Sequence, residues 1–364
     1  MPQQAIACAL MRGGTSRGLY FLAQDLPSDF GQLQQVLLAA MGSPDVRQID
    51  GVGGAHPLTS KVAIVSKSDH PDADVDYHFW QVKVDEAGIS DSQNCGNILA
   101  GVGPFAIERG LVPAAGDITP VRIRMRNTDS FCVANVQTPG GQVEYQGHTA
   151  IDGVPGTHAP ISIDFLDVAG SSCGSLLPTG NAIDQVKGYD VTCIDNGMPV
   201  VLLNASQFDL QGNESPAELE ANDALRARLE AIRLEAGQIM NLGEVGSKTV
   251  PKMSLLSSDG QGRLTTRTFI PHRVHESIGV LGAVSVATGL AVKGSVAQRV
   301  TGMELGSGTH QIEVGHPTGA FQVELEVQLT DAVEPKIARS ALVRTARMLM
   351  DGKVYVPAVT GENK

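Results

Sequence analysis

Aromatic residues and charges are scarce in this 364-residue chain, and the charge that is present is mostly negative. Only 4% of the residues are aromatic and 18% are charged, and 39 Asp and Glu against 27 Lys and Arg give a formal net charge of −12. An acidic chain without a basic block lacks the electrostatic footprint of proteins that bind nucleic acid or anionic membranes. We therefore expect neither as a partner, although local cations can still bind an anionic small molecule.

Long apolar runs and paired cysteines are also missing. The N-terminal apolar run stops at Arg12 with no basic region before it, so it does not match a signal peptide. The uncharged stretch 277–292 is too short to span a bilayer. Five widely spaced cysteines without a C-x-x-C pair disfavour a disulfide framework and a zinc site. We expect reduced thiols in a cytoplasmic protein.

Glycine and apolar residues, in contrast, are abundant. The chain has 41 Gly and 19 Pro, and 42% of its residues are hydrophobic. This composition favours short strands that are joined by tight turns around a packed core. The length favours two domains.

Three segments carry helix signals. Residues 29–41 have one apolar face and are followed by Gly and Pro. Residues 95–107 are small and apolar, and Pro104 predicts a kink or an unpaired carbonyl one turn earlier. Ser215-Pro-Ala-Glu218 fits a capping box that opens a helix running to Gly243. The charges of this last helix predict a solvated face, with a homodimer contact as the alternative.

The chain shows signs of an internal duplication. A second small-residue helix, 277–292, begins half a chain length after Cys95, and strand-like segments precede both helices at 75–84 and 264–269. We expect an α+β protein with two similar domains, each wrapping strands around one buried helix. The predicted boundaries are 1–184 and 185–364, with the last element free to cross back to the first domain.

Two glycine-rich segments of the first half carry cations. Arg12-Gly-Gly-Thr-Ser-Arg17 lies between two predicted strands, and its guanidiniums, hydroxyls and backbone N–H groups can hold a carboxylate. The alternative is an ordinary hairpin turn with surface arginines. Lys61 enters an apolar strand after the turn 51–60. A partly desolvated lysine can serve as a general base, whereas a lysine that extends its ammonium to water would only mark the strand end.

Asn94-Cys-Gly-Asn97 opens the helix predicted at 95–107. A thiol at a helix N-terminus has a lowered pKa, and the N–H groups there can bind a carboxylate or stabilise an enolate. We interpret Cys95 as functional, and Cys8, Cys132, Cys173 and Cys193 as buried, inert thiols.

The second half offers cations, histidines and hydroxyls near its own predicted helix. Arg267 lies on a predicted strand, His275 and Ser277 precede the helix 277–292, and His316 lies on a late turn. Singly, each histidine is typical of a hydrogen-bonded structural residue. No H-x-x-x-H, H-E-x-x-H or G-x-S-x-G spacing occurs, so we expect no metal and no serine-hydrolase elbow.

Taken in order, these motifs resemble those of the PrpF-like isomerases, a family with the diaminopimelate epimerase fold. The resemblance rests on Arg12–Ser16, Leu58–Lys61, Asn94–Asn97, His275–Gly279 and His316-Pro317, and it extends through 41–51, 194–200 and 342–347. It therefore covers nearly the whole chain. Within the family, the chain is similar to the 4-oxalomesaconate tautomerases and Δ-isomerases of gallate and protocatechuate cleavage.

The resemblance implies a fold and a reaction. Each domain would be a curved, mostly antiparallel sheet around a central helix, with the active site between the domains. The reaction would be a cofactor-free proton transfer on a small unsaturated di- or tricarboxylate. For this chain it implies isomerisation of 4-oxalomesaconate in the degradation of aromatic acids and lignin. Alternatives are isomerisation of 2-methylaconitate or methylitaconate, and a non-catalytic carboxylate-binding protein.

The resemblance also implies roles for individual residues. Lys61 and Cys95 would face the substrate, Lys61 as the base and Cys95 as a second acid/base or as the group that stabilises a dienolate. Diaminopimelate epimerases place a second cysteine in the other half, where this chain has Ser277. The substrate-binding residues implied are Arg12, Gly14, Thr15, Ser16, Arg17, Ser60, Asn94, Gly96, Asn97, Arg267, His275, Ser277, Ile278, Gly279 and His316.

Overall fold

The chain folds into two compact units in a computed structural model that describes residues 2–91, 94–166, 168–260, 262–270 and 273–358. Unit 1 combines Met1–Ile163 with Val343–Lys364, and unit 2 is Asp164–Leu342. The division differs from the boundary expected at 184/185. Residues before 184 belong to unit 2 because Cys173 lies in its core and the backbone N–H of Cys173 donates to Asp195 Oδ2 at 2.9 Å.

Unit 1 consists of a sheet, one outer helix and two short inner helices. Its strands are β1 (Gln3–Gly13), β2 (Ser16–Leu22), β3 (Lys61–Lys67), β4 (Val75–Val82), β5 (Ile89–Ser90), β6 (Ile118–Met125), β7 (Ser130–Gln137) and β17 (Ala346–Pro357). Its helices are α1 (Phe30–Met41), α2 (Gly96–Leu99) and α3 (Val102–Glu108), with 3-10 turns at Ala23–Asp25, Pro57–Thr59 and Pro139–Gly141. Strand β8 (Ile161–Leu166) passes the division into unit 2.

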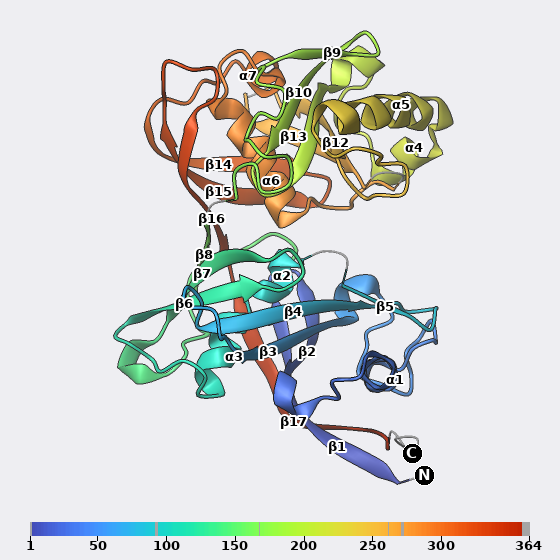
Figure 1. The fold of residues 1–364 in the computed structure, drawn as a ribbon, viewed down its shortest axis with the longest axis vertical. Coiled ribbons are helices and arrows are strands. Elements are labelled where there is room, and N and C mark those ends of the chain that lie inside the picture. Colours follow the sequence, from blue (N-terminus) through green and yellow to red (C-terminus); the bar gives the residue numbers. More distant parts are fainter. Residues whose placement is uncertain (1, 92–93, 167, 261, 271–272, 359–364) are drawn as a thin grey trace. The chain divides into compact units, whose positions relative to one another are not determined.

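The last strand of the chain belongs to the first unit. Strand β17 pairs antiparallel with the whole of β1, from Gln3 opposite Pro357 to Gly13 opposite Ala346, and the two run side by side in Figure 1. The C-terminal segment therefore does cross back, and it brings residues 345–347 next to the end of β1.

Unit 2, like unit 1, consists of a sheet and helices. Its strands are β9 (Asp184–Val186), β10 (Tyr189–Asp195), β11 (Pro199–Asn204), β12 (Lys252–Ser258), β13 (Leu264–Phe269), β14 (Gly308–His316), β15 (Gly319–Gln328) and β16 (Lys336–Arg344), whose last two residues belong to unit 1. Its helices are α4 (Pro216–Ala221), α5 (Asp223–Ile239), α6 (Val280–Thr288) and α7 (Val296–Thr301), with 3-10 turns at Ala205–Phe208 and Gly289–Ala291.

The two units share one order of strand pairing. In unit 1, β1–β2 is antiparallel, β2–β3 parallel, β3–β4 antiparallel, β4–β6 parallel and β6–β7 antiparallel. In unit 2, β10–β11, β11–β12, β12–β13, β13–β14 and β14–β15 follow the same alternation. This agreement supports the internal duplication that the sequence indicates. It also makes Lys61 and Lys252 equivalent, since each is the first residue of the third strand in the pattern.

Each sheet has helices on both faces. In unit 1, α1 packs its Val36, Leu37 and Ala40 against the face that carries Val62 and Trp80. On the other face, α2 and α3 lie against the strands from β1 to β7, and Gly103 allows α3 to approach Val136 and Ala134 closely. The sheet therefore wraps around α2 and α3, as expected for the central helix.

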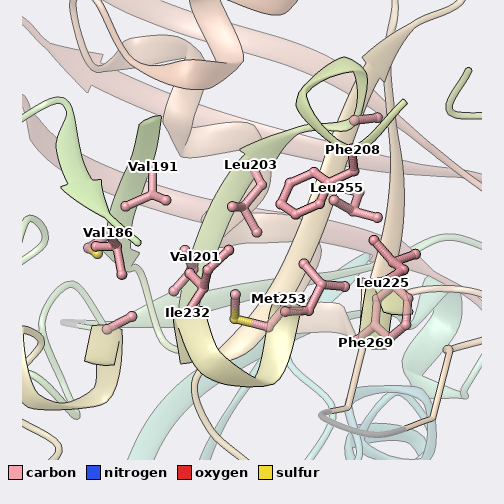
Figure 2. Close-up of a cluster of buried hydrophobic side chains, with 14 of the residues drawn as sticks. Val186, Val191, Val201, Leu203, Phe208, Leu225, Ile232, Met253, Leu255 and Phe269 are labelled. Atoms are coloured by element: carbon pink, nitrogen blue, oxygen red, sulfur yellow. The ribbon is translucent and has the colours of Figure 1, made fainter. Parts of the chain in front are cut away.

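The core of unit 2 is formed where α5 covers its sheet. Leu225, Leu229 and Ile232 of α5 pack against Val201, Leu203, Met253, Leu255 and Phe269 of the strands, and ten residues of this cluster are labelled in Figure 2. The capping box expected at Ser215 is present, because its side chain accepts from the Glu218 N–H and Glu218 accepts from the Ser215 N–H. The single helix expected from 215 to 243 is wrong, since Asn222 ends α4 and caps α5.

The central helix of unit 1 is also divided. The helix is interrupted at Ala100 and Gly101, between α2 and α3. Pro104 has no N–H to donate to the carbonyl four residues earlier, which is that of Ala100, so the break lies where Pro104 predicts it. No helix in the described part of the chain has both the length and the apolar composition needed to cross a bilayer.

Candidate active site

The hairpin between β1 and β2 closes through a two-residue turn, Gly14-Thr15. Arg12 faces Arg17 across the hairpin. The Nη1 of Arg12 donates to the carbonyl of Gly14 at 2.9 Å, and to the carbonyl and hydroxyl of Thr345 at 3.0 Å each. The N–H of Gly14 donates to the same Thr345 carbonyl at 2.9 Å. The returning C-terminal segment therefore holds the turn and one edge of the Arg12 guanidinium.

Three other side-chain atoms of this hairpin lack a hydrogen-bond partner among the described residues. They are Arg12 Nη2, Ser16 Oγ and Arg17 Nε, and all three are buried. Burial lowers the pKa of Arg12, and the charge of the neighbouring Arg347 lowers it further. Unpaired donors are costly when buried, and two guanidiniums facing each other add positive charge. The cluster is therefore suited to an anionic group such as a carboxylate.

The helix α2 meets this hairpin through Asn97. The Asn97 amide donates to Thr15 Oγ1 at 3.1 Å. A side chain at Gly13 would overlap the Asn97 carbonyl, and one at Gly14 would overlap the Asn97 side-chain oxygen. The two glycines are therefore required by a close approach. The structure brings together the predicted motifs Arg12–Ser16 and Asn94–Asn97, which are about eighty residues apart in sequence.

Cys95 is the N-cap residue of α2 and is only partly buried. Helix α2 has only four residues, so it has no long helix dipole. What it offers at this end is the first backbone N–H groups, those of Gly96 and Asn97. The other four cysteines are buried, as predicted. Burial raises the pKa of Cys173 to about 12, so this thiol stays protonated and unreactive. Cys95 is thus the accessible thiol of the chain.

Two buried tyrosines donate hydrogen bonds to the backbone at the start of α2. The hydroxyl of Tyr20 on β2 donates to the Ile98 carbonyl at 2.5 Å, and that of Tyr77 on β4 donates to the Cys95 carbonyl at 3.2 Å. Burial raises the pKa of both phenols well above the usual range, with the nearby Cys95 as a second cause. Both tyrosines therefore remain hydrogen-bond donors and fix the backbone that carries the thiol.

Lys61 begins β3 and is almost fully buried, with 7% of its surface exposed. Its backbone passes against Gly18, where a side chain would overlap the Lys61 carbonyl. The Lys61 Nζ donates to Gln81 Oε1 at 2.5 Å and lies 5.2 Å from the centre of the Phe79 ring. The desolvated setting expected for this lysine is present, and its closest polar partner is a neutral amide.

Lys61 and Cys95 lie on the same face of the sheet. Tyr77, Phe79 and Gln81 alternate along β4, so their side chains share one face. Tyr77 contacts the backbone of Cys95, while Phe79 and Gln81 contact the Lys61 amine. Strand β4 therefore positions both predicted catalytic groups.

The Ser60 hydroxyl forms hydrogen bonds within the loop that precedes Lys61. Its hydroxyl donates to Gln48 Oε1 at 2.8 Å and to the His56 carbonyl at 2.9 Å, and its side chain is fully buried. Gln48 Oε1 also accepts from the Ala55 N–H at 2.9 Å. Ser60 thus supports the loop before Lys61, and substrate binding by its hydroxyl stays a prediction.

The segment before Cys95 is tied to the turn between β6 and β7. The amide of Asn94 donates to Thr128 Oγ1 at 2.5 Å, and Asn127 donates to the Asp91 carbonyl at 2.8 Å. Asn94 Oδ1 is buried and has no partner among the described residues. Ser92 and Gln93, which precede this motif, lie outside the described residues.

In unit 2, three of the predicted residues meet before α6. The N–H of Ser277 donates to His275 Nδ1 at 3.0 Å, and Ser277 Oγ lies 3.3 Å from His316 Nε2. His316 Nδ1 accepts from the Thr318 N–H at 3.3 Å, so Nε2 carries the proton toward Ser277 when the ring is neutral. Ile278 is buried, and Gly279 is an exposed N-cap of α6. Pro271 and His272 lie outside the described residues.

Arg267 is not part of this group. It pairs in register with Leu255, whose side chain belongs to the core under α5. Its Nε donates to the Glu214 carbonyl at 2.6 Å and its Nη1 to the Thr266 carbonyl at 3.1 Å. His275 follows Val274, which contacts that same core, so alternation places the His275 side chain on the opposite face. Substrate binding by Arg267 stays a prediction, but Arg267 and His275 would have to act from different faces.

Gln81, Tyr20 and Tyr77 were not singled out from the sequence. A signal for Gln81 exists, since it continues the inward positions Val75, Tyr77 and Phe79 with a polar residue. The tyrosines give no such signal, because buried aromatics in strands are common. Within the described residues, no three His, Cys, Asp or Glu side chains gather as metal ligands would.

Comparison with known proteins gives close relatives over nearly the full length. The chain is 58% identical over 351 residues to a (4E)-oxalomesaconate Delta-isomerase of Novosphingobium sp. strain KA1, which covers 96% of this chain and 97% of that protein. It is 57% identical to a 4-oxalomesaconate tautomerase of Pseudomonas putida, over 98% of this chain and 97% of that protein.

A solved structure agrees with the fold. The crystal structure of a methylitaconate-delta-isomerase superposes with a TM-score of 0.84 at 34% sequence identity, covering 100% of both chains. The expected α+β fold of the diaminopimelate epimerase type is therefore correct. The model of the PrpF protein family matches residues 3–357, and with these relatives it shows that the chain belongs to the PrpF family.

Proposed function

We propose that this protein isomerises 4-oxalomesaconate by moving a proton, either as a 1,3-allylic shift or as a keto–enol tautomerisation. The observation that carries the proposal is the identity of 57–58%, over nearly the whole chain, to two proteins named for that substrate. The methylitaconate isomerase of known structure is 34% identical, and it supports an isomerase acting on a small unsaturated acid.

Lys61 is the proposed base. The substrate carbon beside the carbonyl would give its proton to the neutral Lys61 amine, and the electrons of the broken C–H bond would enter a dienolate. The resulting ammonium would return one proton two carbons away, which regenerates the amine and moves the double bond. Burial and a neutral hydrogen-bond partner support this role, since neither stabilises the ammonium as a carboxylate would.

Cys95 is the second proposed catalytic group. It either transfers one of the two protons or donates to the dienolate as charge develops. Its accessibility and the first N–H groups of α2 beside it support both roles.

The open donors of the β1–β2 hairpin are the proposed carboxylate site. Arg12, Ser16 and Arg17 each keep a buried polar atom without a partner among the described residues, and Gly14 and Thr15 shape the turn. Asn94, Gly96 and Asn97 border it at the start of α2. From unit 2 we propose His275, Ser277, Ile278, Gly279 and His316 as further substrate-binding residues, and substrate binding by Ser60 and Arg267 stays a prediction.

The biological setting is proposed from the same similarity. We place the reaction in the degradation of aromatic acids such as gallate, protocatechuate and those released from lignin. A cytoplasmic location fits five cysteines that are all free. We further propose a homodimer that works without cofactor or metal.

The test is to follow candidate acids by NMR in deuterium oxide. We expect 4-oxalomesaconate to gain deuterium at the allylic carbon and to convert to a product whose spectrum distinguishes enol from shifted alkene. The same measurement with 2-methylaconitate and methylitaconate should show little turnover. Turnover of one of these, with 4-oxalomesaconate unchanged, would replace the proposed substrate. Binding of all three without exchange would leave a carboxylate-binding protein.

A further inference from the structure

The side chain of Gln81 is fixed in one orientation by its surroundings. Its Nε2 donates to the carbonyls of Pro57 at 3.1 Å, Ser60 at 3.0 Å and Val82 at 3.1 Å. Rotating the amide by half a turn would face its oxygen toward these carbonyl oxygens, which accept but cannot donate. The three carbonyls therefore define which end of the amide is the oxygen.

That oxygen is directed at the Lys61 amine. Lys61 and Gln81 are register partners on β3 and β4, and the Nζ to Oε1 distance is 2.5 Å. The amide oxygen can only accept, so the amine must point one N–H at it in both of its protonation states. The Phe79 ring limits the amine on another side at 5.2 Å. These contacts leave Lys61 with a defined orientation.

The charge of the partner matters as much as its position. Within the described residues, no carboxylate forms an ion pair with Lys61, and the strand beside it contributes Gly18 and the cation Arg17. A carboxylate at the place of Gln81 would hold the amine as an ammonium, which could not accept a proton. An amide gives the same hydrogen bond without a full charge.

We propose that Gln81 is the positioning residue of Lys61: it holds one N–H of the amine and directs the remaining lone pair at the substrate carbon. The inference rests on the proposed function, in which Lys61 transfers the proton. In that step the lone pair takes the substrate proton, and the ammonium returns a proton from a position that Gln81 does not hold. The N–H bound to Gln81 stays in place throughout.

Two variants of Gln81 and one control test the inference. Gln81→Glu adds a carboxylate at the same place, so the acidic limb of the pH profile of kcat/KM, where activity is lost as the amine takes up a proton, should move upward by about one pH unit or more. Gln81→Met keeps the length but loses the acceptor, and kcat should fall at least about tenfold with little change in KM. Gln137→Glu, on the half-buried Gln137 of β7, adds the same charge in the same unit and should leave the profile unchanged.

A measurement without turnover separates this inference from the proposed function. The rate at which Lys61 is acylated by an amine-selective reagent is followed against pH by mass spectrometry, in the wild type and in Gln81→Glu. We expect the pH at which the acylation rate reaches half its maximum, the midpoint, to be higher in Gln81→Glu than in the wild type. An unchanged midpoint together with an unchanged pH profile would overturn the role of Gln81, even if the wild type isomerises 4-oxalomesaconate. Failure of the wild type on every acid would instead overturn the proposed function, while a raised midpoint would still support the contact.

Discussion

Single side chains determine the surroundings of Cys95. The thiol is accessible, but its backbone is held by the Tyr77 hydroxyl and by the start of α2. The sequence could single out Cys95 because two asparagines flank it, which is unusual for an inert thiol. The sequence could not show that the tyrosines support it, since that contact depends on the register of β4 against a helix eighteen residues later.

Replacing Cys95 by serine should lower kcat about 100-fold or more, because a hydroxyl is a far weaker acid than a thiol and stabilises a dienolate less well. The rate with 4-oxalomesaconate measures the effect. Cys132→Ser, on a buried cysteine of β7, serves as the control and should retain the wild-type kcat. Wild-type turnover by Cys95→Ser would remove the thiol from the mechanism.

At the scale of elements, the β1–β2 hairpin closely approaches the short helix α2. Local signals predict much of this scale: Gly42 ends α1, Ser215 opens α4, and Pro104 divides the helix after Cys95. What local signals do not predict is which face of a strand a cation occupies. Arg267 sits on the α5 side because of its register with Leu255, a non-local contact that its own segment does not encode.

Gly14→Ala tests the close approach. Gly14 has a φ of +50°, and a Cβ there would overlap Asn97 Oδ1, so alanine must displace the Asn97 side chain that contacts Thr15 as well as strain the turn. We expect a loss of about 1–3 kcal/mol in the free energy of unfolding and a drop in kcat/KM. Denaturant unfolding and steady-state rates measure the two effects.

Gly116→Ala is the matched control, since Gly116 has a φ of +77° and open space around its Cβ position. It should cost about 1–2 kcal/mol of stability through backbone strain and leave the rate unchanged. If Gly14→Ala matched this control in both measurements, the contact between the hairpin and α2 would be unimportant for activity.

At the scale of the whole molecule, the repeated order of strands is the main organising feature. The half-chain spacing of two small-residue helices predicts the repeat, and the matching pairing orders agree with it. The boundaries could not be predicted as well, because residues 164–184 and β17 are assigned by contacts with distant strands. The repeat also leaves a second buried lysine, Lys252, at the position equivalent to Lys61.

Lys252 should make the stability of the protein rise with pH. Burial, helped by the charge of Arg233, lowers its pKa in the folded chain from 10.5 to about 8. Between these two values the unfolded chain binds the proton and the folded chain does not, so the cost of burying the ammonium disappears as pH rises through 8. From pH 7.5 to 9.5 the wild type should gain about 2 kcal/mol in unfolding free energy relative to Lys252→Met. Identical pH dependence in the two proteins, measured by denaturant unfolding, would show that Lys252 is not desolvated.

In the proposed mechanism the Lys61 amine moves the proton, and the Lys61→Met variant tests this step. Lys61→Met replaces the amine by an apolar side chain of similar length at a buried position. The unfolding transition of the variant checks that it folds. With 4-oxalomesaconate in deuterium oxide, we predict that this variant neither forms product nor incorporates deuterium at the carbon that exchanges in the wild type. Product formation and deuterium uptake near the wild-type rate would contradict the account.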